Sequence, residues 1–459
     1  MSPRPNSLLA RLVGLTLVLA GTNCDARDDL LSILEIAEQM DPEYREAQAQ
    51  ALSVAEGVPQ AKAELFLPTL SFSTGTSWVR QDIENASTFG SGGNISFVTE
   101  NYRINLSQPI YHHDRFIALK QADKRVQQAQ LEVLAARQEL MIRVSERYFD
   151  VLAARDNLEF AQTEKESLLS QLEQAQQRFD VGLIAITDVQ EAQAGYDRAL
   201  ASEISALNQV ENANEALREV TESYHIDLAP LGETLPLVVP QPTDIEAWTR
   251  TALTKNLELT AAELAAQIAR DEIQVQYAQH FPTLDVTGGH GWNKQGGRFG
   301  STSVTQGDIG VEFNMPIFEG GRTVSRTRQA EHDHRAALER LQQTRRAVYR
   351  QTRKAYLGVV SQISLVKALR QAVISSETAL ESTRAGFEVG TRTAIDVVAA
   401  ERGLSQARRD YARAKYDYIL EILQLKQAAG SLRPEDIAIA NSWLDDSSRE
   451  SSIDENSIQ

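Results

Sequence analysis

Apolar side chains recur with a helical period over most of the chain. Between about residues 112 and 178 there is no glycine or proline, and the apolar positions follow a three–four spacing: Leu134, Met141, Val144, Tyr148, Val151 and Leu158. A matching stretch from about 322 to 386 is interrupted only by Gly358. At ~1.5 Å per residue, the first stretch predicts a helix roughly 100 Å long. Such helices must bury their apolar seams laterally, against the chain itself and against neighbouring copies.

Alanines spaced seven residues apart mark the segment that follows each long stretch. In the first half these are Ala192, Ala199, Ala206 and Ala213, beside Val189, Tyr196, Val210 and Leu217. In the second half they are Ala400, Ala407, Ala414 and Ala428, beside Val397, Leu404, Tyr411, Tyr418 and Leu425. Such positions form the seam of a coiled coil, where alanine lets helices approach closely. An ordinary helical hairpin explains one such segment but not the same register in both halves.

Three short motifs occur twice in the same order, which indicates an internal duplication. The pairs are Phe66–Leu70 with Phe281–Leu284, Gln108–Tyr111 with Met315–Phe318, and Phe179–Gly182 with Phe387–Gly390. We therefore predict two structural repeats, 27–220 and 246–429. A Pro-rich linker, 221–245, separates them, and a short segment, 430–440, follows the second. Apart from Trp443 and Leu444, the Ser- and acid-rich residues 441–459 have little to bury and are predicted to be a disordered tail.

Each repeat also carries two segments with the period of a β-strand. The predicted pairs are 69–80 with 96–108 and 283–294 with 304–315. In the last strand the apolar residues Ile309, Val311, Phe313 and Met315 alternate with Asp308, Gly310, Glu312 and Asn314. Apolar side chains on one face and polar ones on the other are typical of a transmembrane barrel strand, which needs ~9–11 residues.

Four strands cannot span a bilayer alone, because two open edges would leave backbone groups unpaired in hydrocarbon. Closure against symmetric copies removes the edges. Three copies would give twelve strands, above the ~8 at which side chains fill a barrel interior, so the lumen would hold water. The alternative is a soluble four-stranded sheet on a helical bundle.

Residues 1–26 are predicted to be a secretory signal peptide. Arginines precede a short apolar run, Leu12 to Ala20, and small residues follow it at Cys24-Asp25-Ala26. The run is shorter than the ~20 residues of a spanning helix, and we identify no later window that is long and apolar enough. Cys24 is the only cysteine, so the mature chain is expected to form no internal disulfide. Lipidation of Cys24 is an alternative that the preceding Asn23 disfavours.

Composition excludes several functions. The formal net charge of the 459-residue chain is −17, so a basic nucleic-acid-binding face is not expected. The histidine pairs His112-His113 and His332/His334 lack the spacing of a helical metal site and are interpreted as surface residues. No constellation of Ser, His and Asp or of Cys and His appears. We predict neither an enzyme nor a metal or cofactor site.

From about Asp29 to Ala440 the chain resembles the TolC family of outer-membrane efflux and secretion channels. The resemblance is most specific at Gln176–Leu183, Ala185–Gln190, Val389–Thr393 and Asp396-Val397. It implies a homotrimer in which a twelve-stranded outer-membrane barrel continues into a periplasmic α-helical barrel. A mixed α/β equatorial domain, to which 221–245 and 430–440 would contribute, would surround the waist.

The family resemblance also implies partners and a gate. The channel would dock a periplasmic adaptor and an inner-membrane transporter of the RND, ABC or MFS class, and would act as a passive exit duct. Gly182 and Gly390 would be helix-turn hinges at the periplasmic tip. Arg392 would reach Thr187 and Asp188 on a neighbouring hairpin as a latch, and Asp396 would form a cation-selective ring. Capping of the following helix is the other reading of Asp188 and Asp396.

Two positions depart from the family pattern. Phe387 stands where a latch tyrosine is expected, and Ala399 stands where a second aspartate is expected. We therefore predict a latch with fewer hydrogen bonds, resting mainly on Arg392, and a single acidic ring. The competing function is a periplasmic coiled-coil adaptor or scaffold that does not span the membrane. Alternating strands argue against it, because an adaptor needs no lipid-facing β segments.

Overall fold

The computed structural model describes residues 28–83, 93–225, 227–232, 235–297 and 300–445. The predicted signal peptide and Cys24 lie outside the described residues. The first half contains α1 (Leu30–Met40), α2 (Pro42–Ala55), α3 (Gly57–Phe66), β1 (Thr69–Ile83), β2 (Gly93–Tyr111), α4 (His113–Asp180) and α5 (Ile186–Thr221). The second contains α6 (Ile245–Lys255), α7 (Leu257–Ala278), β3 (Thr283–Gly297), β4 (Gly300–Asn314), α8 (Arg322–Glu388) and α9 (Ala394–Ala428), followed by α10 (Pro434–Asn441). The same order of elements thus occurs twice, with α7 in the place of α2 and α3.

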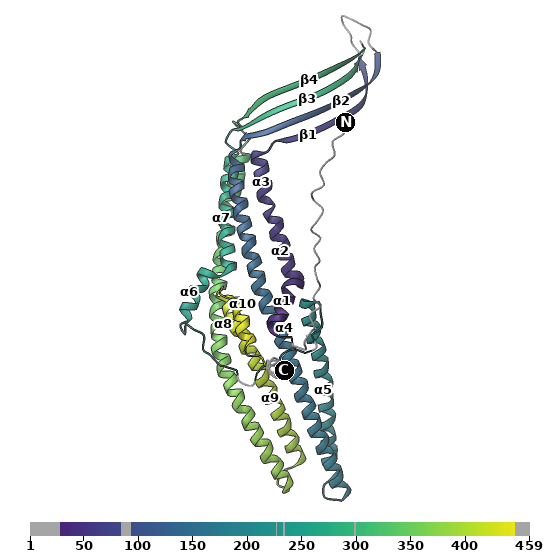
Figure 1. The fold of residues 1–459 in the computed structure, drawn as a ribbon, viewed down its shortest axis with the longest axis vertical. Coiled ribbons are helices and arrows are strands. Elements are labelled where there is room, and N and C mark those ends of the chain that lie inside the picture. The colour runs from purple at the N-terminus through teal and green to yellow at the C-terminus, as the bar shows by residue number, and fades with distance from the viewer. Residues whose placement is uncertain (1–27, 84–92, 226, 233–234, 298–299, 446–459) are drawn as a thin grey trace, which may run out of the picture.

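The helices form one tall layer below the sheet (Figure 1). We call the level of residues 221–245 and 430–440 the waist. Below it, α9 packs against both α4 and α8, and α5 packs against α4. Above the waist α7 takes the place of α9, between α4 and α8, while α2 and α3 take the place of α5. The predicted alanine seam is confirmed, since Ala192, Ala199 and Ala206 of α5 are all buried. The chain is therefore a curved wall whose edges are α8 on one side and α5 with α2 and α3 on the other.

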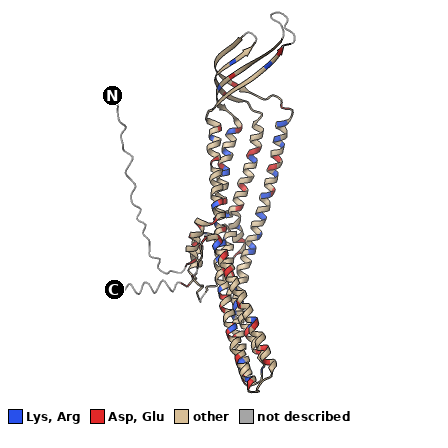
Figure 2. Ribbon diagram, turned by 90° about the vertical axis from the view of Figure 1, so that its right-hand side faces the viewer, with Lys and Arg blue, Asp and Glu red and all other residues tan. Residues whose placement is uncertain are grey.

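The four strands form one antiparallel sheet in the order β1-β2-β3-β4. They are 15, 19, 15 and 15 residues long, longer than the alternation alone predicted. One face carries large apolar side chains that nothing in the described chain covers: Leu70, Phe72, Trp78, Val98, Ile104, Leu106, Ile309, Val311 and Phe313. The other face is polar, and on it Arg103 pairs with Asp308 at 3.3 Å. Figure 2 shows that most charged residues lie on the helices instead.

A compact core at the waist joins the wall to the segments between the repeats. Tyr148 of α4 donates a hydrogen bond to the carbonyl of Ala229 at 2.8 Å, and Tyr418 of α9 accepts one from the Val238 amide at 2.7 Å. Both tyrosines are fully buried, and burial raises the pKa of each. The described part of 221–245 is therefore tied to the long helices by side chains that those helices supply.

Two expectations from the sequence are wrong in detail. Leu444 is buried and bridges Leu231, so residues 441–445 pack at the waist and do not belong to the tail. Residues 446–459 lie outside the described part. The second long helix is continuous as predicted: α8 passes through Gly358, beside which the Glu421 carboxylate lies. Finally, α8 does contain an apolar 18-residue window, of mean hydropathy 1.3, with only 17% of it buried. One window of this kind is weak support for a spanning helix, since a helix with an apolar edge also produces it.

The joint between α9 and α7 depends on Gly430. Its φ is +66°, and a Cβ there would lie 2.3 Å from the Lys255 carbonyl oxygen. Across the same joint Asn256 donates from Nδ2 to the Ala428 carbonyl at 3.2 Å. The two helices are thereby stacked into one column, and only a residue without a side chain fits between them.

Gly430→Ala is expected to destabilise the protein by more than ~1 kcal/mol, because it combines a positive φ with a backbone clash. Gly403→Ala is the matched control. Gly403 lies inside α9, and a Cβ added there would meet nothing within 4 Å, so alanine should stabilise by about 0.5–1 kcal/mol. Thermal unfolding of the purified protein, followed by far-UV circular dichroism, measures both. Equal unfolding midpoints for the two variants would show that the fit of Gly430 between α9 and α7 does not stabilise the protein.

Candidate functional site at the helix tips

The two turns at the lower end of the wall have the same backbone structure. In the first, the Leu183 amide donates to the Arg178 carbonyl at 2.9 Å and Gly182 has a φ of +76°. In the second, the Thr391 amide donates to the Gly386 carbonyl at 2.8 Å and Gly390 has a φ of +77°. This is a Schellman ending, in which a left-handed glycine satisfies the last carbonyls of a helix. The repeats therefore end in equivalent hairpin tips, side by side (Figure 1).

Arg392 lies folded over its own turn. A Cβ on Gly386 would come within 2.7 Å of Arg392 Cγ, so the glycine leaves room for the arginine stem to cross α8. The Gly386 carbonyl also accepts from the amides of Thr391 and Arg392 and from the Thr391 hydroxyl. Sequence reasoning gave Gly386 no role, although its position one helical turn before Gly390 was a visible signal.

Asp396 caps α9. Thr393 donates to its carboxylate from the backbone amide at 2.9 Å and from the hydroxyl at 3.0 Å, and the two residues form a capping box. The backbone hydrogen bond, then the hydroxyl and the charge of Arg392, lower the pKa of Asp396 below its ordinary 3.8. The capping interpretation is thus confirmed for Asp396. In α5 the cap residue Ala185 makes no side-chain bond, and Asp188 lies in the first turn, where the helix dipole favours an acid.

Within one chain the structure does not bring the predicted latch residues together. In the part of the chain that is described, the side chains of Thr187, Asp188 and Arg392 form no hydrogen bond or ion pair. The contact that joins the two tips is a different one. The Arg178 guanidinium lies over the Phe387 ring, 4.8 Å from its centroid. Arg178 was not predicted as a site residue, since on sequence alone it is one more helix-terminal arginine.

Two further features surround this contact. Gln171 of α4 donates to the Ala394 carbonyl at the start of α9, at 3.1 Å. Between the hairpins lies a cleft of about 400 Å³, lined by residues that include Arg178, Arg384, Phe387 and Glu401. The tip of one chain is therefore two hairpins held together by side chains of α4, α8 and α9.

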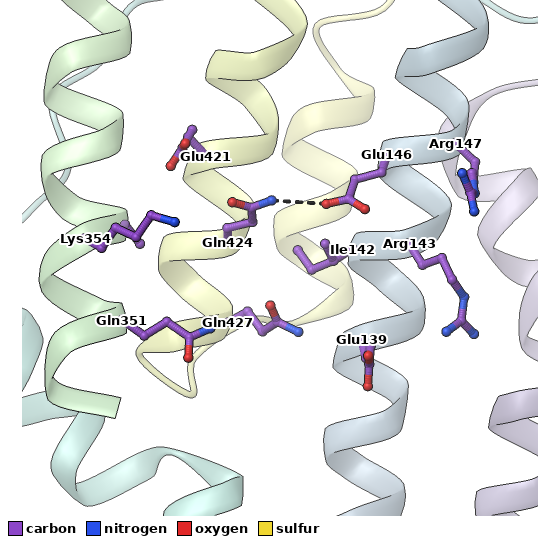
Figure 3. Close-up of a pocket in the computed structure, with 11 residues that line it drawn as sticks. Glu139, Ile142, Arg143, Glu146, Arg147, Gln351, Lys354, Glu421, Gln424 and Gln427 are labelled. Carbon is purple, nitrogen blue, oxygen red and sulfur yellow. Dashed lines mark hydrogen bonds between the residues drawn. The ribbon is translucent and has the colours of Figure 1, made fainter. Parts of the chain in front are cut away.

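Elsewhere in the described part of the chain, a cleft at the waist and His112 make polar contacts between elements. A polar cleft at the waist lies between α4, α8 and α9, where Gln424 donates to Glu146 at 3.1 Å (Figure 3). Among the described residues no group of three His, Cys, Asp or Glu side chains could hold a metal ion. His112, interpreted as a surface residue, is buried instead and bonds Asp285 at 3.0 Å, where β2 passes into α4.

Comparison with known proteins shows to which family the chain is related. The family model described as outer membrane efflux protein matches residues 33–222 and 248–431. The chain is 38% identical to the outer membrane protein TolC of Vibrio cholerae, over 91% of this chain and 94% of that protein. It is 32% identical to that of Escherichia coli, over 95% and 89%. The alkaline protease secretion protein AprF of Pseudomonas aeruginosa is 29% identical, over 89% and 86%.

Solved structures agree on the fold. The outer membrane channel CmeC of Campylobacter jejuni superimposes with a TM-score of 0.72 at 18% identity, covering 97% of this chain and 98% of that one. The open state of the Neisseria gonorrhoeae channel MtrE gives 0.66 at 19% identity, covering 89% and 91%. The predicted fold class, a β-barrel segment continuous with a helical barrel segment, is thus confirmed. The chain belongs to the outer membrane efflux protein family, and it is a channel protein of the outer membrane, not an enzyme.

Proposed function

We propose that three copies of this chain form a passive exit duct for efflux and protein secretion, closed at its periplasmic tip. The observation that carries the proposal is that the chain is open at matching edges. The sheet ends in β1 on one side and β4 on the other, and the helical wall ends in α5 and α8. One rotation about a common axis joins β4 to β1 and α8 to α5 of the next copy.

Uncovered apolar residues support closure through both layers. Leu357 on α8 is 57% exposed, and Ile204 on α5 is 62% exposed. On the sheet, Ile309 is 86% exposed. Hydrocarbon would cover the outer face of a closed barrel, and neighbouring helices would cover the wall edges. A periplasmic scaffold leaves the apolar sheet face without a partner.

The names of the relatives support the two transport roles. One relative is named as an alkaline protease secretion protein and another as an outer membrane efflux protein. We propose that this chain works with a periplasmic adaptor and an inner-membrane transporter of the RND, ABC or MFS class. The duct itself supplies a water-filled path and no chemical step.

The tip residues supply the gate in this proposal. Arg392, exposed at the second turn, reaches Thr187 and Asp188 of a neighbouring copy, and Asp396 of three copies forms the cation ring. Gly182 and Gly390 are the hinges. Phe387 has no hydroxyl to donate, and the Arg178 stacking contact takes over its part of the latch within each chain.

Arg392→Ser is expected to give larger conductance steps and a higher open fraction. Losing a charge-assisted bond at each tip should raise the open fraction about tenfold. Single-channel conductance in a planar bilayer measures it, with small cation-selective steps for the wild type. Arg402→Ser removes an exposed arginine further along α9 and should behave as wild type. Large pores of equal size in wild type and Arg392→Ser would rule out the latch.

Ala399→Asp is expected to strengthen block by a trivalent cation roughly tenfold, because positions 396 and 399 share one helix face. Ala399→Asn is the uncharged control. If the aspartate leaves the blocking concentration unchanged, position 399 does not face the pore.

Cation selectivity should persist as the pH falls. The hydrogen bonds from Thr393 lower the pKa of Asp396, so its carboxylate stays charged below the ordinary 3.8. The cap contributes its full stability above that pH, and both cap and selectivity are lost only as the pH falls through the lowered pKa. Reversal potentials measured from neutral pH down to about pH 3 test this. Thr393→Ala should move the loss of selectivity to higher pH, and an unchanged profile would argue against Asp396 as the ring.

Phe387→Leu should open the channel about two- to fivefold more often, because a half-exposed cation–π contact contributes ~0.5–1 kcal/mol. Phe387→Tyr keeps the ring face under Arg178 and should conduct as wild type does. The same bilayer recordings test both variants. Identical opening of the leucine and tyrosine variants would exclude a role for the ring face.

A further inference from the structure

Glu401 is a buried acid that the predicted gate does not use. It lies on α9, about two turns above the second hairpin tip, and is 6% exposed. Its Oε1 accepts a hydrogen bond from the Ser167 hydroxyl of α4 at 2.7 Å, and it also pairs with the Arg384 guanidinium of α8. Arg384 Nη2 lies 3.0 Å from Ser167 Oγ as well, so the three groups are in mutual contact.

These groups come from two different hairpins. Ser167 belongs to the α4–α5 hairpin, whereas Arg384 and Glu401 both belong to the α8–α9 hairpin. Next to them a small apolar cluster spans the same boundary: Leu168, Ala199 and Val398. One to two turns higher, Arg409 of α9 pairs with the buried Glu164 of α4 at 3.3 Å. Glu401 therefore lies in the contact between the hairpins, near its lower end.

The contacts of Ser167 with Glu401 and Arg384 can break, when the hairpins move apart, without breaking the ion pair between Glu401 and Arg384. A buried carboxylate that loses its cation is strongly destabilising. Here Arg384 is on the same hairpin as Glu401, so the ion pair stays intact during separation. The Ser167 hydroxyl is neutral and can bond water once it is released. Within this group, separation therefore breaks two hydrogen bonds at Ser167, one donated to Glu401 and one accepted from Arg384, and leaves neither charged group without a partner.

We propose that Glu401 is a gating residue. Its carboxylate, held in place by Arg384, accepts from Ser167 of the other hairpin and holds each chain shut, in addition to the latch between copies at Arg392. We call the contact of Glu401, Arg384 and Ser167 the clasp. Arg384 is a positioning residue in it. The inference rests on the proposed function in one respect, that separation of the hairpins opens the duct.

Cysteine labelling tests the clasp without reference to conductance. The mature chain as predicted has no cysteine, so Val398→Cys places a single thiol in the buried contact between the hairpins. In this background Ser167→Ala should raise the rate of maleimide labelling at least about tenfold, as expected for loss of the hydrogen bonds that Ser167 makes with Glu401 and Arg384. Ser167→Thr retains the hydroxyl and should restore the slow rate.

Ser170→Ala is the matched control. Ser170 lines the same cleft one turn along α4, but its hydroxyl accepts from Gln174 of its own helix and does not bridge the hairpins. The alanine there should leave labelling unchanged. Glu401→Ala should also raise labelling, and combining it with Ser167→Ala should add nothing to the effect of Ser167→Ala, because the alanine at 167 already removes the bond to Glu401. Slow labelling in Ser167→Ala, or fully additive effects, would overturn the clasp.

Bilayer recordings then test whether the clasp gates. Ser167→Ala is expected to raise the open fraction about tenfold over wild type and over Ser170→Ala, as Arg392→Ser does. An effect of Arg392→Ser without any effect of Ser167→Ala would overturn the gating role of Glu401 and leave the proposed function standing. Faster labelling with unchanged conductance in both variants would instead overturn the tip as the gate.

Discussion

The unpaired backbone at the two edges of the sheet constrains everything else in this molecule. Each edge strand offers a row of amides and carbonyls over 15 residues, which hydrocarbon cannot satisfy. Once copies must close into a barrel, the helical wall beneath has to close with the same rotation. This explains why α8, at one edge of the wall, carries several exposed apolar side chains, among them Leu338, Leu357 and Ile374, and why Ile204 and Leu207 of α5 are exposed at the other edge.

Much of the fold could be predicted because the chain is duplicated, so each sequence pattern occurs in both repeats. The alanine heptads fixed the seams of α5 and α9, and the repeated Val-Gly turns placed both hairpin tips. Strand lengths were underestimated, since alternation fades near the tips of hairpins where side chains meet only water. Leu444 was assigned to a tail because its partner, Leu231, lies more than two hundred residues away, and a local pattern carries no signal for such a contact.

The site was predicted less completely, for a physical reason. Sequence motifs identify residues in turns, and they led to Arg392, Asp396 and the glycines. The contacts that join the hairpins lie on helix faces, where Ser167, Arg178, Arg384 and Glu401 look like ordinary members of polar helices. These side chains meet because the helix faces that carry them point toward one another across the α4–α8 and α4–α9 contacts, and the sequence does not show how the helices are oriented. Phe387 illustrates the same point, because the missing hydroxyl was visible but the arginine above the ring was not.

The stacked joint at Gly430 has a mechanical consequence. Two columns of each wall, α4 and α8, run unbroken from the tip to the sheet, whereas α9 meets α7 end to end and α5 continues beneath α1 and α2 (Figure 1). An end-to-end joint transmits compression but little torque. A rotation of the lower hairpins therefore reaches the sheet as a twist only through the two continuous helices, α4 and α8. The interrupted columns end at the waist and carry load along the long axis instead.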